Sequence, residues 1–266
     1  MKSKHEILTA LARSDSERLL LAGLLDKEQA CSLRGYLTHT RFLDLNERAK
    51  CTEAVRLAGV TGHALFWGGY ADAERGIYLF YPDYMDADTA RAAAPLALLR
   101  AHKRREDKLT HRDYLGALMG LQIDRSVVGD ILVHEEGADI LVLEDMADFI
   151  LLHFAKAGRK QISLTREPLA EIKAAAHTEK EGTGSVASPR LDSVVALVFG
   201  LPRKEAQAKI EHGLVFLNNV PCLKPERQVA EGDRLTVRGV GRARVEAFGG
   251  TSRKGRVFIQ YVKNIS

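Results

Sequence analysis

The segment from Arg203 to Cys222, RKEAQAKIEHGLVFLNNVPC, restricts the possible folds more than any other part of this 266-residue chain. Helix-forming residues run without a break to Gly213, and glycine is the residue that most often ends a helix. Two short apolar runs then flank Asn218-Asn219, and asparagine tolerates the positive φ that a two-residue hairpin turn requires. The segment therefore predicts a short basic helix followed directly by a tight β-hairpin.

A second short helix is predicted immediately upstream. The sequence RLDSVVALVFG has helical spacing of its apolar residues and ends at Gly200, and Pro202 opens the next helix. Two short helices joined by so few residues pack against each other, with Leu191 and Val195 facing Ile210. This packing leaves the polar residues of the second helix largely off the core, namely Arg203, Lys204, Gln207 and Lys209.

Further strands are predicted after the hairpin. EGDRLTVRGV has a turn at Gly232-Asp233 followed by a strand, and RARVEAF and RVFIQYV predict two more strands. The segment GGTSRKGR between the last two strands predicts a loop. That loop carries Arg253, Lys254 and Arg256.

Positive charge is concentrated in this last part of the chain. Residues 188–266 carry 14 Lys and Arg against 7 Asp and Glu, whereas the preceding residues carry 25 against 28. A basic module on a near-neutral body predicts a polyanionic partner. On charge alone, a basic face that is merely solvated explains the pattern equally well.

The rest of the chain predicts three further regions, and the predicted fold class is α+β. Residues 1–66 have apolar residues at helical spacing and predict an N-terminal helical region. Residues 67–176 predict a central domain in which strand, helix, strand, strand, helix and strand follow one another from Leu96. This is the ferredoxin-like βαββαβ order, with one extra strand at 77–81 ahead of it. Residues 177–187 are rich in Gly, Ser and Thr and predict a flexible linker before a domain at 188–266.

Two features of the central domain leave alternatives open. RAHKRREDK, residues 100–108, is either a second RNA surface or a solvated strand end. Trp67 and Tyr70, beside Gly68-Gly69, either stack on a base or seal a junction between domains, and we favour the junction.

The sequence contains no spacing typical of a catalytic, metal or cofactor site. Cys31, Cys51 and Cys222 lie far apart, which argues against a zinc ribbon or a disulfide framework and suits a reducing compartment. LLLAGLL, residues 19–25, is too short to span a bilayer and does not follow a signal-peptide pattern. We therefore expect a cytoplasmic protein with no cofactor, no membrane partner and no small-molecule substrate.

The C-terminal residues resemble the alpha-L RNA-binding domain first described in small-subunit ribosomal protein S-four. Pro202 stands where serine is common in that family, and Asn219 where glycine usually completes the turn. The matching residues, in family order, are Arg190-Leu191-Asp192, Arg203, Ala206, Gly213, Val215, Asn218 and Gly232-Asp233.

Three other segments extend the resemblance to the YlmH-type bacterial RNA-binding proteins: GGYADAERGIYLFYPDY, THRDYLGALMGLQIDRSVVGDI and SRKGR. This resemblance implies a non-catalytic protein that binds structured ribosomal RNA and transfer RNA. It further implies action on large ribosomal subunits that carry stalled nascent chains, and a link to cell division.

The C-terminal module would bind RNA through cations on phosphates, a helix N-terminus, and side-chain hydrogen bonds to 2′-hydroxyls. The candidate RNA-binding residues are Arg190, Arg203, Lys204, Gln207, Lys209, His212, Asn218, Asn219, Lys224, Arg253, Lys254 and Arg256.

A rival interpretation is an RNA-modifying enzyme, because the same module accompanies pseudouridine synthases and RNA methyltransferases. Neither the glycine-rich cofactor loop of a methyltransferase nor the long catalytic domain of a pseudouridine synthase is evident in the sequence. A third interpretation is a protein-docking adaptor whose basic face meets an acidic partner.

Overall fold

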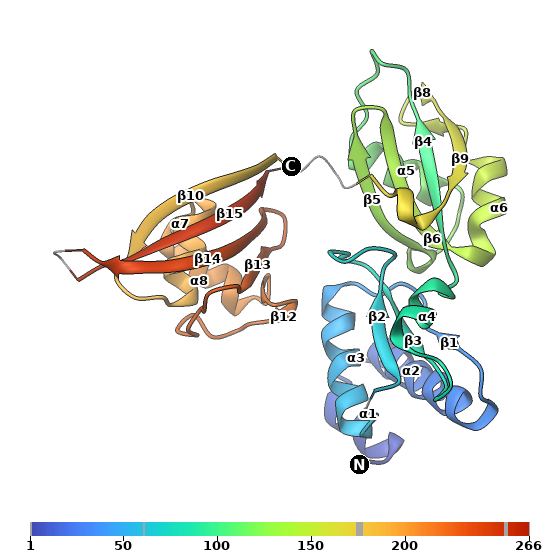
Figure 1. Ribbon diagram of the computed structural model, residues 1–266, viewed down its shortest axis with the longest axis horizontal. Helices are drawn as coiled ribbons and strands as arrows, with labels where there is room; N and C mark the ends of the chain where they lie inside the picture. The colour runs from blue at the N-terminus through green and yellow to red at the C-terminus, as the bar shows by residue number, and fades with distance from the viewer. Residues whose placement is uncertain (1, 61, 174–177, 253–254, 266) are drawn as a thin grey trace. The chain divides into compact units, whose positions relative to one another are not determined.

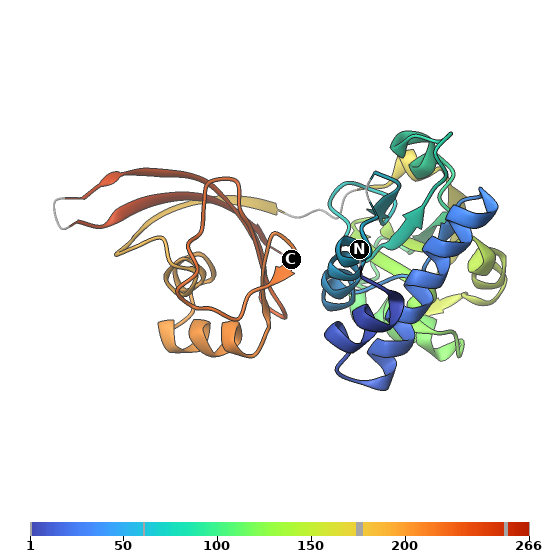
Figure 2. The ribbon, with the colours of Figure 1, turned by 90° about the horizontal axis from the view of Figure 1, so that it is seen from below.

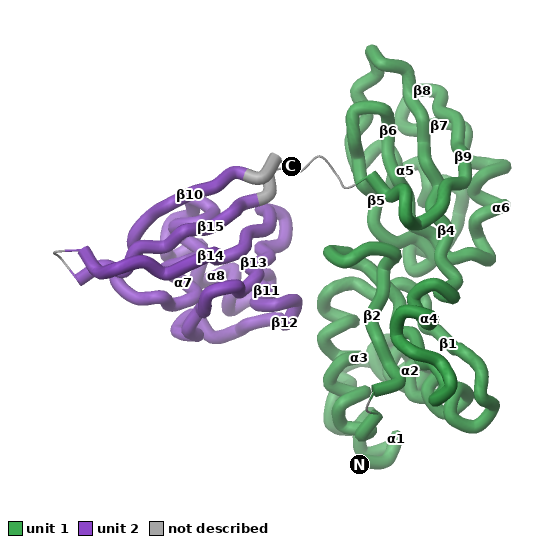
Figure 3. Tube along the Cα trace, in the orientation of Figure 1, with its two compact units in different colours: residues 1–175 green, residues 176–266 purple. Residues whose placement is uncertain are grey.

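Two units divide the chain, residues 1–175 and residues 176–266 (Figure 3). The structure is a computed structural model that describes residues 2–60, 62–173, 178–252 and 255–265. The first unit builds hydrophobic cores in its N-terminal and central parts, and the second unit has a core of its own. Within the described ranges, no helix combines the length and the apolar character needed to cross a membrane.

The N-terminal part of the first unit consists of helices and a small sheet. Ser14 and Asp44 cap the starts of two helices, each by accepting a hydrogen bond from a backbone N–H of the first turn. The same helices end at Gly35 and Gly59, whose φ values of 67° and 73° suit a residue without Cβ. The elements are α1 (Lys4–Leu11), α2 (Asp15–Arg34), α3 (Leu45–Ala58) and an antiparallel sheet of β1 (Thr38–His39), β3 (Ile77–Phe80) and β2 (Ala64–Trp67).

The strand expected ahead of the central sheet belongs instead to this N-terminal sheet, where β3 pairs with β1 and β2. Tyr78 and Phe80 pack in the N-terminal core, whereas Ile77 and Leu79 pack in the central core. Successive side chains of a strand point to opposite faces, so β3 is buried on both faces and joins the two cores. The predicted boundary after residue 66 falls inside β2.

The central part is built on a four-stranded antiparallel sheet in the order β5-β6-β4-β9. The order of elements predicted from Leu96 is present, with an additional hairpin, β7–β8, between the second helix and the last strand. Gly158, with φ of 55°, lies in the turn of that hairpin. The elements are α4 (Ala87–Ala92), β4 (Leu96–His102), α5 (His111–Gly120), β5 (Val128–His134), β6 (Gly137–Leu143), α6 (Glu144–His153), β7 (Lys156–Ala157), β8 (Lys160–Gln161) and β9 (Ser163–Glu167).

The second unit packs two helices on one side of a six-stranded sheet in the order β10-β15-β14-β13-β11-β12 (Figures 1 and 2). Apolar residues of both helices, among them Val195 and Ile210, are fully buried with strand residues such as Val245 and Ile259. The elements are β10 (Thr178–Val186), α7 (Leu191–Phe199), α8 (Arg203–Glu211), β11 (Val215–Leu217), β12 (Val220–Pro221), β13 (Arg234–Val237), β14 (Gly241–Thr251) and β15 (Val257–Ile265).

The segment predicted as a flexible linker is a strand, so this prediction was wrong. β10 pairs antiparallel with β15 over its whole length. The glycines that suggested a linker make room for side chains instead. A Cβ on Gly182 would lie 2.4 Å from the Tyr261 ring, and a Cβ on Gly184 would lie 2.6 Å from Leu197. The second unit therefore begins before the predicted linker ends.

Candidate nucleic-acid interface

The start of the α7–α8 helix pair is organised around one buried carboxylate. Asp192 has no exposed surface and lies in the first turn of α7. Its oxygens accept hydrogen bonds from Arg190 at 3.2 Å and from Arg203 at 2.9 Å. They also accept from Gln207 Nε2 at 3.3 Å and from the Ser193 backbone N–H at 2.8 Å. Asp192 therefore brings three of the predicted RNA-binding residues together.

The charges of this cluster stabilise one another. Burial acts to raise the pKa of the Asp192 carboxyl, but hydrogen bonds from Arg190 and Arg203 outweigh it and hold the pKa below its ordinary value. The hydrogen bond to Asp192 likewise raises the pKa of Arg190. The Asp192 carboxylate is therefore charged at neutral pH. Because arginine is not deprotonated in proteins, the two guanidinium groups outweigh this one carboxylate and the cluster has a net positive charge.

Arg203 lies off the core, as predicted, but its guanidinium group is also bound to a buried carboxylate. Its Nε and Nη2 atoms donate to Asp192, so part of its charge compensates a buried carboxylate. The Arg203 side chain is nevertheless 57% exposed, and that of Arg190 is 34% exposed. A guanidinium group has five N–H donors, so each arginine can be fixed on one side and still present donors to solvent.

The other predicted RNA-binding residues of α8 and its C-terminal end differ in their exposure and in their contacts. Lys204 is exposed and directly follows Arg203 at the start of the helix. Lys209 is only 23% exposed, and its ammonium group lies 3.5 Å from the Glu205 carboxylate on the next turn. The His212 Nδ1 lies 2.5 Å from the carbonyl oxygen of residue 208, so this ring is engaged with its own helix.

The hairpin turn has the predicted backbone, with φ of 52° at Asn218 and 64° at Asn219. The Asn218 side chain also makes two hydrogen bonds within the unit, which the sequence did not predict. Its amide group donates to Asp233 at 2.7 Å, and its oxygen accepts from the Arg234 backbone N–H at 2.9 Å. Asn218 therefore fastens the hairpin to β13 although it is exposed, and Asn219 is partly exposed.

Four predicted residues lie farther along the chain. Lys224 is exposed after β12. The Arg256 guanidinium donates to the Ser185 hydroxyl at 3.0 Å and to the Ser185 carbonyl, so it ties the β14–β15 loop to β10. Arg253 and Lys254 lie outside the described residues.

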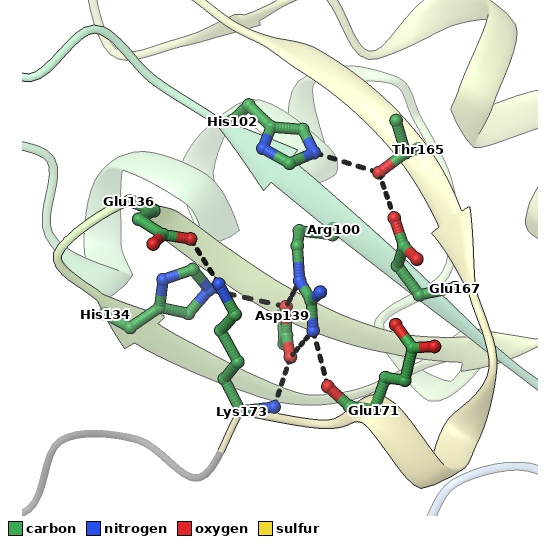
Figure 4. A network of polar contacts seen from close by, with 9 residues as sticks. All are labelled: Arg100, His102, His134, Glu136, Asp139, Thr165, Glu167, Glu171 and Lys173. Carbon is green, nitrogen blue, oxygen red and sulfur yellow. Dashed lines mark hydrogen bonds and ion pairs between the residues drawn. The ribbon is translucent and has the colours of Figure 1, made fainter.

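A second buried ion pair lies on the central sheet (Figure 4). Asp139 has no exposed surface, and the Arg100 guanidinium donates to both of its oxygens, at 2.7 and 2.9 Å. The chain after β9 crosses this site, since the Lys173 backbone N–H donates to Asp139 at 2.7 Å and the Glu171 carbonyl accepts from Arg100 at 2.6 Å. The pair therefore holds residues 168–173 against the sheet.

This geometry bears on the segment 100–108, which was a candidate second RNA surface. Arg100 is 7% exposed and bound to Asp139, so it is a structural residue. His102 remains partly exposed, and its ring contacts Thr165, which in turn donates to Glu167 (Figure 4). The first charge of the segment thus serves the fold rather than a ligand.

Trp67 and Tyr70 lie where the N-terminal and central parts of the first unit meet, which favours the junction interpretation. Trp67 is at the end of β2 and packs against the central core, with the Arg91 guanidinium 5.6 Å above its ring. The Tyr70 hydroxyl donates to the Asp130 carboxylate at 2.8 Å. Both rings therefore have structural partners.

Asp192 is the organising residue that the sequence reasoning did not select as a site residue. The available signal was its position in the RLD motif, between two arginines that a helix pair would bring close.

Among the described residues, no group of three or more His, Cys, Asp or Glu side chains is placed to hold a metal ion.

Comparison with known proteins matches two segments of the chain to families. Residues 101–171 match the family described as "Putative RNA-binding domain in YlmH", and residues 189–235 match the S4 domain. The "Ribosome-associated protein quality control protein P2" of Bacillus subtilis (strain 168) is 33% identical over 224 residues, which are 82% of this chain and 83% of that protein. A solved structure, "Cell division protein ylmH from Streptococcus pneumoniae", is 23% identical, with a TM-score of 0.48, and covers 60% of this chain and 96% of that chain.

Proposed function

Because this chain belongs to the YlmH family of RNA-binding proteins, we propose that it binds structured ribosomal RNA and transfer RNA without catalysing a reaction. A relative that is 33% identical is named as a ribosome-associated quality control protein. The proposal for this chain is a ribosome-associated role of the same kind, on large subunits that carry stalled nascent chains. A link to cell division is a separate proposal, which rests on the resemblance alone.

The observation that carries the proposal is the fixed pair of guanidinium groups on Asp192, beside the exposed Lys204. Because a buried carboxylate orients Arg190 and Arg203, little side-chain entropy is lost when they bind a phosphate. The backbone N–H groups of the first turn of α8 add a partial positive charge at the same place. Each neutralised phosphate releases counterions, so binding is expected to weaken steeply as the salt concentration rises.

Lys204 is the residue to test. Charge reversal at Arg203 would place a second carboxylate against Asp192 and would perturb folding as well as binding. Lys204→Glu avoids this problem, since Lys204 is exposed. Lys180→Glu is the matched control, because Lys180 is an exposed lysine on β10 of the same unit.

The measurement is co-sedimentation with purified bacterial large ribosomal subunits at several salt concentrations. Loss of one phosphate contact and introduction of a repelling charge are expected to weaken association about tenfold in Lys204→Glu near 0.1 M salt. The Lys180→Glu protein should bind like the wild type. Equal binding of all three proteins would contradict the proposed interface.

The non-catalytic part of the proposal has its own test. The protein is incubated with bulk RNA and labelled S-adenosylmethionine, and separately with RNA that carries tritium at C5 of uridine. Transfer of the methyl label would identify a methyltransferase, and release of tritium would identify a pseudouridine synthase. We expect neither.

A further inference from the structure

A cavity of about 530 Å³ lies in the N-terminal part of the first unit, and none of its described lining residues is assigned to RNA binding. Its lining residues come from the C-terminal ends of α2 and α3 and from the segment that follows β3. Its described lining residues include the carboxylates of Glu28 and Asp83 but neither lysine nor arginine.

The surroundings of the cavity make it electronegative. Both α2 and α3 end at glycines that line it, Gly35 and Gly59, and a helix C-terminus carries a partial negative charge. The Asp83 side chain is 97% exposed. Its Oδ1 lies 3.3 Å from Nε2 of His63, which also lines the cavity, so Oδ2 is the oxygen left for a ligand. Burial, followed by the charges of Glu28 and Asp83, raises the pKa of the Cys31 thiol, which lines the same cavity.

The cations nearest in sequence to the two helix ends do not cancel this charge inside the cavity. Arg56, in the last turn of α3, is paired with Glu53 and is not a lining residue. Arg34, in the last turn of α2, donates to the Tyr36 hydroxyl at 3.4 Å and is also not a lining residue.

Aromatic side chains line the same cavity, and two exposed apolar residues adjoin its lining residues in sequence. Tyr81 and Tyr84 line the cavity, and Tyr84 is 76% exposed although its hydroxyl donates to the Gly35 carbonyl at 3.1 Å. Leu33 and Tyr36, which adjoin the lining residues of α2 in sequence, are 76% and 46% exposed. Aromatic side chains that line a cavity are typical of a ligand-binding site, and exposed apolar residues close to it in sequence agree with one.

We infer that this cavity binds the lysine or arginine side chain of a basic, partly apolar segment of a protein partner. The two carboxylates and two helix C-termini would hold the cationic head, and tyrosine rings attract a cation placed near their faces. The apolar rim would contact the stem of that side chain and its neighbours. An RNA partner does not fit, because the carboxylates would repel its phosphates. The first unit would then bind a protein partner, and the second unit would bind RNA.

The test uses the full-length, ¹⁵N-labelled protein and a synthetic pentapeptide, N-acetyl-Ala-Leu-Lys-Leu-Ala-amide. One small anchor gives a dissociation constant on the order of 1 mM, which amide chemical shifts detect. We expect saturable shifts at the amides of Gly35 and Gly59. Replacing the peptide lysine by norleucine, which removes only the charge, should weaken binding at least tenfold.

The protein variants test the carboxylates. Glu28→Gln combined with Asp83→Asn should weaken binding of the lysine peptide at least tenfold, whereas Asp148→Asn, which removes an exposed charge on α6, should not. Equal binding of the lysine and norleucine peptides would overturn the inference even if the double variant failed to fold. Shifts that appear with spermidine but not with the peptide would also overturn it, because the site would then recognise a free polyamine.

Discussion

Asp192→Asn is the substitution that most directly tests the arrangement of the helix pair. It preserves the shape of the side chain but removes the charge that binds Arg190 and Arg203. Loss of one partner of a fully buried ion pair costs about 3–5 kcal/mol. Here the guanidinium groups left behind are 34% and 57% exposed, so water can solvate them, and screened ion pairs contribute about 0.2–1 kcal/mol each. We expect the free energy of unfolding to fall by about 2 kcal/mol.

The loss should depend on pH in a defined direction. The pKa of Asp192 is lower in the folded protein than its ordinary value, so the ionised carboxylate stabilises the fold. That contribution is complete above the unfolded-state pKa of about 3.9 and disappears as the pH falls through the folded-state pKa. The difference in stability between the wild type and Asp192→Asn should therefore be constant from about pH 5 to 8 and shrink below about pH 4.

Urea is the suitable denaturant, because it does not screen ion pairs. Far-UV circular dichroism follows both units, and fluorescence of Trp67, the single tryptophan, follows the first unit. Glu181→Gln is the control, since it removes an exposed charge on β10 and should change stability by less than about 0.5 kcal/mol. If Asp192→Asn left the far-UV transition at the wild-type urea concentration, the stabilising role of this carboxylate would be refuted.

Three further substitutions test other parts of the structure. Gly184→Ala should cost about 1–3 kcal/mol by thermal denaturation, because its Cβ would clash with a leucine of α7, whereas Gly250→Ala meets nothing within 4 Å and should be nearly neutral. Asn219→Ala, at φ of 64°, should lower the free energy of unfolding by about 1–2 kcal/mol, because alanine adopts this backbone conformation less readily than asparagine. A loss no larger than the measurement error would contradict this. Arg100→Met removes the guanidinium that pairs with the buried Asp139 carboxylate and should cost about 3–5 kcal/mol at pH 7. Burial acts to raise the pKa of the Asp139 carboxyl, and without the hydrogen bonds from Arg100 this carboxyl should accept a proton at a higher pH than in the wild type. The loss should therefore shrink as the pH falls, and a pH-independent loss would contradict this.

Local backbone requirements were predictable from the sequence because they depend on one or two residues. Gly200 and Gly213 end the helices of the second unit with φ of 67° and 70°, and Asn218-Asn219 form the predicted turn. Glycine and asparagine adopt positive φ angles that most other residues avoid, so helix ends and tight turns can be predicted at these positions without knowing the rest of the fold.

The structural role of a residue could not be predicted in this way where it depends on contacts with residues distant in sequence. Gly182 and Gly184 have the same chemistry as linker glycines, but their role is set by Tyr261 and Leu197, which approach them only in the folded sheet. The exposure of Arg203 could be predicted from helical periodicity, whereas its pairing depends on Asp192, eleven residues away along the chain. Charge composition indicates where cations gather, but not which of them already have a carboxylate partner.

The position of β15 in the second unit affects when that unit can fold during synthesis. This strand is made last among the described elements, yet it lies between β10, which is made first, and β14. Until Ile265 has left the ribosome, β10 lacks the neighbour that pairs with its whole length. The sheet that supports the helix pair is therefore completed only after translation of the unit has finished. A product truncated before residue 257 would leave β10 without a partner strand and would expose β14 as an edge of the remaining sheet.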